Sequence, residues 1–284
     1  MNILIFGHVC IDHNVSETHS FTGAGGPAMF MRRIFSQLPN CSVTIVAPYG
    51  PDFTRYVGMT RLFPESPLSI DTMVYENTVH QGVRTQRCLN HEHAEPIAID
   101  STVEALITKA DTICIAPLAP TFPPSYIQHI AMKKKWQTPI TLLPQGYFRS
   151  FDVDNRVGIR EFVEAKDILP LVDTVIISDN DYSDSQGIAS AWAHTYETTI
   201  VMTQAEKGAT VFHTDTVKHI ATEVVREEDI VSAIGAGDIF SAGYMYGFSQ
   251  THEPTKAVAF GNALARQCLS FAPDAIKIEL PSLV

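Results

Sequence analysis

The stretch "VSAIGAGDIFSAGYMYGF", residues 231–248, joins a glycine-rich turn to the start of a long apolar helix. Gly235 and Gly237 flank Ala236, and a single carboxylate, Asp238, follows them. The first turn of a helix carries unpaired backbone N–H groups and the positive end of the helix dipole. Small residues at that point let a phosphate come close to the backbone. The stretch therefore predicts an anion-binding turn with an acid beside it.

Asp238 stands where a carboxylate could take part in catalysis. A carboxylate beside an anion-binding turn can accept the proton of a hydroxyl group that attacks a phosphoryl group. The helix that follows is apolar on almost every side, so it should be buried and hold its first turn rigidly. The alternative is that Asp238 only caps a buried helix and the glycines only turn the chain.

The composition narrows the class of protein. The chain has 284 residues, of which 45% are hydrophobic and 18% charged, so a sizeable core is available. The formal net charge of −11 argues against nucleic acid or an anionic membrane as the main partner, but not against nucleotides. Five scattered cysteines without a C-x-x-C pair favour free thiols in a reducing compartment. Without a signal peptide or a transmembrane stretch in view, we expect a cytoplasmic protein.

Apolar runs bounded by turn residues alternate with helix-like segments along the chain. Most of the runs are continuous, as expected of strands buried on both faces of a parallel sheet. The strand-like runs are residues 2–9, 43–50, 111–118, 139–146, 173–178 and 198–204, and the helix-like segments are residues 25–38, 100–110, 123–135 and 183–196. This alternation predicts a doubly wound α/β fold with a mainly parallel sheet, and a ligand at the carboxyl ends of its strands.

One region interrupts that rhythm. Residues 70–91 alternate polar and apolar side chains around "HQG", residues 80–82, which indicates an antiparallel hairpin with one solvated or ligand-facing face. A hairpin that projects from a parallel core could act as a lid. No Pro/Gly/Ser-rich linker divides the chain, so we predict a single domain, residues 1–284, with a β lid formed by about residues 12–22 and 70–93.

Taken together, the segments resemble the ribokinase-like (PfkB) family of carbohydrate kinases. The C-terminal signature of that family, D-T-x-G-A-G-D before an apolar helix, reads "SAIGAGD" here. The other similar segments follow in the order of the family and are "GHVCIDHN", "GAGGPAMFM", "LLPQGYFR", "ISDNDYS", "VMTQAEKGATVF" and "AVAFGNALA". The segments "GGPAMF" and "RTQRCLNHEHAEPI" resemble the inositol and small-sugar kinase branch.

The resemblance implies a role for each matching residue. Asp238 would be the general base, and the N–H groups of Gly235, Ala236 and Gly237 would hold the charge of the transferred phosphate. The implied nucleotide-binding residues are Ser178, Thr203, Lys207, Gly208 and Asn262; the implied substrate-binding residues are Asp12, Gly25, Gly26, Arg87 and Gln145. Asp181 would act on Mg²⁺, mainly through the water molecules of the ion. ATP and Mg²⁺ are the implied cofactors.

The sequence departs from the family pattern at four places. The leading Asp and the Thr positions of the signature are Ser232, Ala233 and Ile234; N-x-x-E becomes Ser178 to Asp181; T-x-G becomes Thr203, Gln204 and Ala205; and the position of an Asn that contacts sugar hydroxyls is Phe30. The last change suggests an acceptor pocket that is less polar or differently shaped.

The resemblance implies an ATP-dependent phosphotransferase that acts on a hydroxyl group of a sugar or cyclitol. Two alternatives remain open: a nucleoside kinase, with Phe30 stacking on the base, and a catalytically weak binding or regulatory protein. A P-loop kinase and a dinucleotide-binding oxidoreductase are disfavoured, because neither glycine-rich motif occurs. We expect a small-molecule partner and a monomer or homodimer.

Overall fold

The computed structural model describes residues 1–15, 20–80 and 83–282. Two expectations from the sequence therefore fall partly outside the described residues. The proposed hairpin turn "HQG" includes residues 81–82, and the first lid segment, residues 12–22, includes residues 16–19.

The described residues form a nine-stranded main sheet. In spatial order its strands are β15 (Thr216–Ile220), β14 (Ala209–His213), β13 (Thr199–Thr203), β12 (Thr174–Ser178), β9 (Ile140–Leu142), β8 (Thr112–Ala116), β1 (Asn2–Gly7), β4 (Ser42–Val46) and β5 (Arg61–Phe63). Neighbouring strands run parallel from β13 to β5, and only β14 and β15 pair antiparallel at one edge. The predicted mainly parallel α/β sheet is confirmed.

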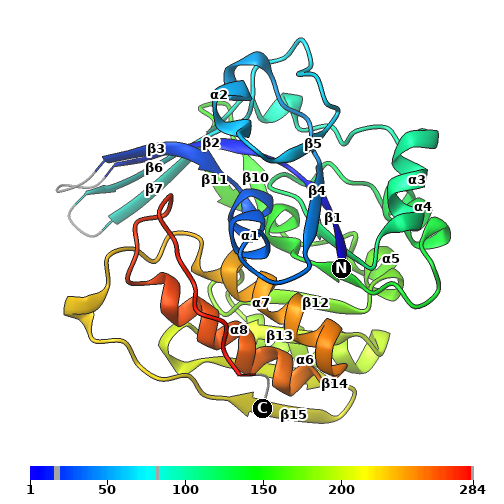
Figure 1. Ribbon diagram of the computed structural model, residues 1–284, viewed down its shortest axis with the longest axis vertical. Helices are drawn as coiled ribbons and strands as arrows, with labels where there is room; N and C mark the ends of the chain where they lie inside the picture. The colour runs from blue at the N-terminus through cyan, green and yellow to red at the C-terminus, as the bar shows by residue number, and fades with distance from the viewer. Residues whose placement is uncertain (16–19, 81–82, 283–284) are drawn as a thin grey trace.

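Helices cover both faces of this sheet. The helices are α1 (Pro27–Phe35), α2 (Thr54–Val57), α3 (Ser101–Lys109), α4 (Pro124–Lys133), α5 (Ala165–Ile168), α6 (Ser185–Tyr196), α7 (Ala236–Thr251) and α8 (Pro254–Cys268). Helices α1, α7 and α8 pack on one face, seen in front in Figure 1, and α3 to α6 pack on the other. Each face of the sheet has its own hydrophobic core, and strand β1 contributes to both. Ile3 and Ile5 belong to the core beneath α1, α7 and α8, and Leu4 and Phe6 belong to the core on the opposite face, so the run is continuously apolar.

Helix α7 is buried on most of its sides because small residues let its neighbour come close. A Cβ atom added to Gly243 would lie 2.8 Å from the Cα atom of Gly261 in α8. The two helices therefore meet almost backbone to backbone. This contact fixes the axis of α7, and with it the first turn that carries Asp238.

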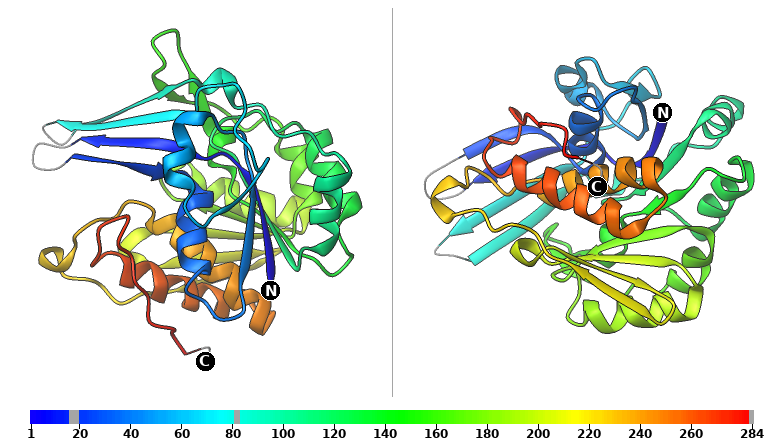
Figure 2. Two further views of the ribbon diagram at one scale, coloured as in Figure 1. Left: turned by 45° about the horizontal axis from the view of Figure 1, so that its top comes forward. Right: turned by 60° about the horizontal axis from the view of Figure 1, so that its bottom comes forward.

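A second, four-stranded sheet projects from one side of the molecule (Figures 1 and 2), and we call it the small sheet. Its strands, in spatial order, are β3 (Ser20–Gly25), β2 (Cys10–Val15), β6 (Val74–His80) and β7 (Val83–Leu89). Strands β2 and β6 pair in parallel, and the two outer pairs are antiparallel. A short hairpin of β10 (Arg149–Phe151) and β11 (Val157–Ile159) adjoins β7, where the N–H of Cys88 donates to the carbonyl of Asn155 at 2.8 Å.

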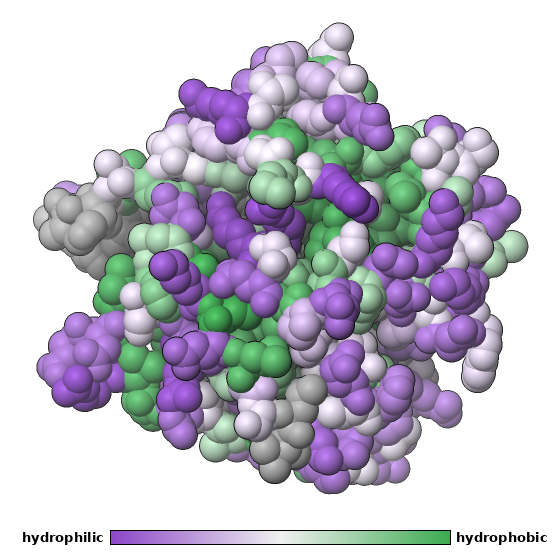
Figure 3. All heavy atoms as spheres, in the orientation of Figure 1, coloured by the Kyte–Doolittle hydropathy of each residue, from purple (hydrophilic) through white to green (hydrophobic). Residues whose placement is uncertain are grey.

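The surface is mixed in polarity. Hydrophilic side chains are distributed over the face seen in Figure 3, with apolar side chains between them, as on most water-exposed protein surfaces. Within the described ranges, no helix is both long enough and apolar enough to cross a membrane.

Candidate active site

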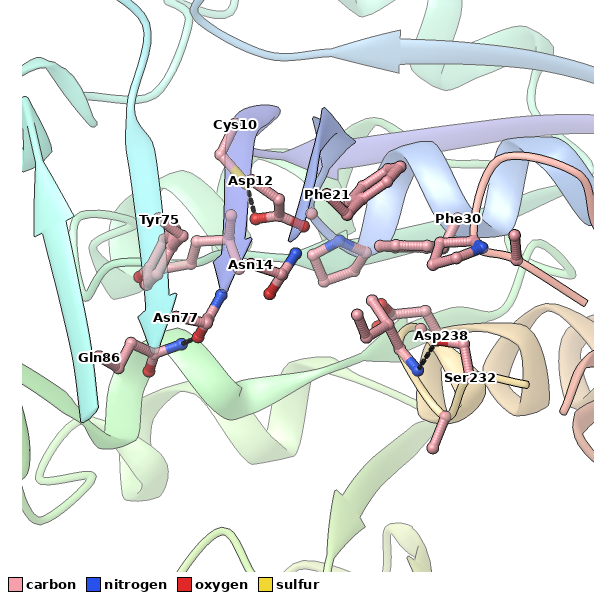
Figure 4. A pocket seen from close by; sticks show the side chains of 18 of the residues that line it. Cys10, Asp12, Asn14, Phe21, Phe30, Tyr75, Asn77, Gln86, Ser232 and Asp238 are labelled. Atoms are coloured by element: carbon pink, nitrogen blue, oxygen red, sulfur yellow. Dashed lines mark hydrogen bonds between the residues drawn. The ribbon is translucent and has the colours of Figure 1, made fainter. Parts of the chain in front are cut away.

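A cavity of about 680 Å³ lies between the small sheet and the first turn of α7 (Figure 4). The start of α1 and the segment after α8 complete its walls. Of the residues implied by the resemblance, five line this cavity: Asp12, Gly26, Gln145, Gly235 and Asp238. The structure thus brings together side chains from the first, middle and last thirds of the chain.

The first turn of α7 leaves backbone donors without partners. Within the described part of the chain, the N–H groups of Gly237 and Asp238 have no hydrogen-bond acceptor, whereas the N–H of Ala236 donates to the carbonyl of Ala233 at 3.2 Å. Gly237 is exposed, and a Cβ atom added to it would meet nothing within 4 Å, so there is free space beside this part of the turn. Of the three expected anion-binding N–H groups, that of Ala236 is already used within the turn, and that of Asp238 was not anticipated.

Gly235 is required at the turn for two reasons. Its φ angle is +79°, a left-handed conformation that side chains rarely adopt. In addition, a Cβ atom there would lie 2.4 Å from the ring of Phe30. The ring of Phe30 therefore packs directly against the turn, and the two residues form one continuous piece of the cavity wall.

The pKa of Asp238 is raised by its surroundings. Burial, together with the negative charges of Asp12 and Asp181, raises its pKa to about 7, and the positive charge of Arg149 opposes this shift. A carboxyl group with a pKa near the ambient pH can both accept and release a proton. The geometry and the charge of Asp238 are therefore compatible with acid–base chemistry in the cavity.

Asp12 faces the cavity from β2 and is 8% exposed. The thiol of Cys10 donates to its Oδ1 atom at 3.3 Å, and burial raises its pKa to about 6. A Cβ atom on Gly25 would lie 2.0 Å from the Oδ2 atom of Asp12. Gly25 therefore provides the space that the carboxylate occupies, although Gly25 itself is not part of the cavity lining.

Arg149 is the positive charge at the centre of this site. Its Nη1 atom donates to the hydroxyl of Tyr75 at 2.9 Å and to the carbonyl of Leu118 at 3.3 Å. Its charge lowers the pKa values of Asp12, Asp181 and Asp238, opposing the effect of burial on each. Arg149 thus compensates three carboxyl groups at once.

Asp181 follows the end of β12 and is not among the residues that line the cavity. Its Oδ2 atom accepts a hydrogen bond from the N–H of Ser178 at 2.8 Å, and burial raises its pKa. The described residues contain no group of three or more His, Cys, Asp or Glu side chains placed to hold a metal ion. One carboxylate is nevertheless compatible with Mg²⁺, which usually binds through one or two carboxylates together with substrate phosphates and water.

The comparison with protein families decides the relationship. The family model described as pfkB family carbohydrate kinase matches residues 76–272. The chain belongs to the pfkB family. A comparison with curated protein sequences finds no match.

Solved structures show the same fold as this pfkB family chain. A pyrophosphate-dependent kinase of the ribokinase family, complexed with a pyrophosphate analogue and myo-inositol, matches with a TM-score of 0.73 and 18% identity over 93% of each chain. The nucleoside kinase of Methanocaldococcus jannaschii matches with a TM-score of 0.69 and 14% identity, over 95% of this chain and 92% of that one. Arabidopsis thaliana ribokinase, complexed with ribose and ATP, matches with a TM-score of 0.71 and 15% identity, over 95% and 92%.

The residues expected to bind the nucleotide, from the resemblance to the pfkB family, lie outside the cavity. The N–H of Gln204 donates to the carbonyl of Gly208 at 2.8 Å, which closes a tight turn after β13, and Lys207 is exposed on that turn. The buried amide of Asn262 donates to the carbonyl of Ile220 at 3.1 Å, and Gly208 packs against the same carbonyl. Thr203, at the end of β13, donates to the carbonyl of Ile177 at 3.3 Å.

Arg87 requires a correction. We expected it to orient the substrate, but its Nη1 atom donates to Glu76 at 3.2 Å and its Nε atom to the carbonyl of Asp154 at 3.1 Å. Successive residues of a strand point to opposite faces. Because its neighbour Gln86 lines the cavity, Arg87 points to the other face of the small sheet.

Three amide side chains in the cavity were missed by reasoning from the sequence: Asn14, Asn77 and Gln86. Strand alternation from Asp12 could have indicated Asn14, because residues i and i+2 share a face. The other two could not be aligned with Asp12 before the pairing of β2 with β6 was known.

Proposed function

We propose that the protein transfers the γ-phosphoryl group of ATP to a hydroxyl group of a sugar or cyclitol, with Asp238 as the general base. The observation that supports this most directly is the first turn of α7. There a carboxyl group with a pKa of about 7 stands beside two unpaired N–H groups and opens into a cavity that also contains Asp12.

The chemistry follows from these positions. The acceptor hydroxyl loses its proton to the Asp238 carboxylate as its oxygen forms a bond to the γ-phosphorus atom. The bond from that phosphorus to the β,γ-bridging oxygen breaks, and ADP leaves. The N–H groups of Gly237 and Asp238 donate to the phosphoryl oxygens, whose charge shifts during the transfer. Asp12 accepts a hydrogen bond from an acceptor hydroxyl and orients it.

Residues on the donor side hold the nucleotide mainly through the backbone of the turn at residues 203–208. In this proposal, Ser178, Thr203, Lys207, Gly208 and Asn262 border the nucleotide. Asp181 faces the hydrated Mg²⁺, which supplies neutralisation of phosphate charge when bound. Gln145, Gly25 and Gly26 shape the acceptor side.

A nucleoside is the second candidate acceptor. Two aromatic rings, Phe21 and Phe30, lie at the same end of the cavity and could stack on a base (Figure 4). The same rings could equally cover the apolar face of a sugar ring. The amide groups at the other end of the cavity favour the polyhydroxylated acceptor.

The test is a phosphotransfer screen with the purified full chain. Sugars, inositols and nucleosides are offered as acceptors with Mg²⁺, and with either ATP or pyrophosphate as donor; the phosphorylated product is measured directly. Pyrophosphate is included because one similar structure was determined with an analogue of it. Turnover of sugars or cyclitols with ATP supports the proposal, and turnover of nucleosides alone supports the second candidate. Nucleotide binding without turnover of any acceptor would indicate the catalytically weak binding protein.

A further inference from the structure

Three amide side chains form one row across the small sheet, which we call the amide row: Asn14, Asn77 and Gln86. The strand register places Asn14 of β2 beside Asn77 of β6, and Asn77 beside Gln86 of β7. Adjacent strands lie about 4.8 Å apart, so the row presents amide groups at regular intervals along one wall of the cavity. All three residues line the cavity (Figure 4).

The end of the row at β2 has an unused donor. Within the described ranges of the chain, the Nδ2 atom of Asn14 is buried and has no hydrogen-bond partner. Buried polar atoms are nearly always paired, so an unpaired one on a cavity wall indicates a group that a ligand satisfies. At the other end, Gln86 donates through Nε2 to the Oδ1 atom of Asn77 at 2.7 Å, which fixes the orientation of the Asn77 amide.

The opposite wall does not supply equivalent groups. Pro27 and Phe30 of α1, with Ala272 and Pro273 after α8, present mainly apolar surface to the cavity. Phe30 is held in place, because Arg33 lies 4.8 Å from its ring centre and also donates to the carbonyl of Pro273 at 2.9 Å. Polar recognition of a ligand therefore comes from the small sheet, from Asp238 and from the other polar residues of the lining, Gln145, Arg149 and Ser232, and not from this wall.

We propose that the amide row selects the acceptor, with Asn14 donating through Nδ2 to one hydroxyl oxygen of a polyhydroxylated ring while Asp12 accepts from another. Asp12 and Asn14 are two residues apart on β2 and share its cavity face, so one ring can contact both. This inference rests on the proposed kinase function, but it concerns binding of the acceptor and not the transfer step.

The test compares Asn14→Leu with the wild-type protein. Leucine has a similar size and cannot donate a hydrogen bond, and because Nδ2 has no partner within the protein, thermal stability should not fall. We expect the KM for the acceptor to rise about tenfold, with the KM for the donor and kcat little changed, since one hydrogen bond corresponds to about a factor of ten. The matched control is Thr85→Leu, on the face of the small sheet opposite to that of Gln86, which should leave every parameter unchanged.

Deoxy analogues of the best acceptor identify the hydroxyl involved. Wild type should discriminate about tenfold against the analogue that lacks the hydroxyl contacted by Asn14, and Asn14→Leu should not. An unchanged acceptor KM with unchanged discrimination would overturn the inference, as would a fall in melting temperature in Asn14→Leu, which would indicate a structural role.

Failure of the kinase proposal can be distinguished from failure of this inference. If wild type transfers phosphate to no acceptor, binding of the same polyols is measured by calorimetry for both proteins. Binding by wild type that weakens in Asn14→Leu supports the inference without any catalysis. Equal binding by both proteins, or no binding by either, overturns it.

Discussion

The two sides of the site differ in how their polar groups are used. On the side formed by the cavity and the first turn of α7, the Nδ2 atom of Asn14 and the N–H groups of Gly237 and Asp238 have no partner among the described residues. On the side proposed to border the nucleotide, the amide of Asn262 and the hydroxyl of Thr203 donate hydrogen bonds to backbone carbonyls. The first side has hydrogen-bond donors that a ligand can use, whereas the side-chain donors of the second side are already bonded within the protein.

This difference indicates that the same kind of residue can serve opposite purposes within one site. An unpaired buried donor destabilises the empty protein and strengthens ligand binding, while a paired one stabilises the fold. Substitutions in the cavity and at the first turn of α7 should therefore mainly change catalysis and affinity, and substitutions of the residues proposed to border the nucleotide should mainly change stability. Five predictions test or sharpen this division.

The largest effect is expected for Asp238→Asn. The asparagine cannot accept the proton of the hydroxyl, so kcat should fall at least about 100-fold while ATP binding remains. Steady-state kinetics and nucleotide titration measure this, with Asp167→Asn on the exposed surface of α5 as the control. Near-normal turnover of the variant would refute the assignment of the base.

The same variant should be more stable than wild type at high pH. The raised pKa of Asp238 means that its ionisation disfavours the folded state, so stability is lost as pH rises from about 4 toward 7. Removing the charge should raise the free energy of unfolding at pH 8 by on the order of 2 kcal/mol. Denaturant unfolding at pH 5 and pH 8 checks this, because the gain should be smaller at pH 5.

Gly237→Ala separates an anion-binding glycine from a merely structural one. The new methyl group meets nothing within 4 Å, and alanine is favoured over glycine in a helix by about 1 kcal/mol, so stability should rise. If the donor phosphate approaches this turn, turnover should nevertheless fall about tenfold or more, because a small misplacement of reacting groups is costly. A variant that is both more stable and fully active would contradict the anion-binding role.

Asn262→Leu should show the opposite pattern. It leaves the carbonyl of Ile220 without its donor, which should lower the free energy of unfolding by about 1–3 kcal/mol. The KM for the acceptor should not change. Thermal unfolding and acceptor kinetics test the division directly, since a stable variant with weakened acceptor binding would show that the two sides are not separate.

The smallest expected effect is on the pH dependence of kcat/KM. Because the base must be ionised, kcat/KM should fall as pH decreases through about 7, the pKa of Asp238. The charge of Asp12 contributes to that raised pKa, so Asp12→Asn should move the acidic limb of the profile to lower pH, whatever its effect on acceptor affinity. A limb that stays in place would mean that another group controls the profile.

The sequence predicted the parts of the molecule that depend on local pattern. Continuous apolar runs such as residues 2–9 became parallel strands, because burial on both faces leaves no polar alternation. The turn before Asp238 was also visible, since glycine at a helix start has a local conformational cause.

What depends on strand pairing could not be predicted. The amide row exists only because β6 pairs with β2, a contact between segments about 60 residues apart. Arg87 was misplaced for a similar reason: which face of a strand is turned to a cavity follows from register and not from charge. The hydrogen bond from Asn262 to Ile220 likewise joins α8 to the end of β15.

The close contact of Gly243 with Gly261 has an evolutionary consequence. It holds the helix that carries Asp238, the proposed base, through main-chain packing, whereas the groups proposed to select the acceptor stand on another element, the small sheet. Substitutions in the sheet can then retune which molecule is accepted without displacing the machinery of transfer. Because the two functions rest on separate elements, acceptor specificity can diverge in evolution while the phosphotransfer reaction is conserved.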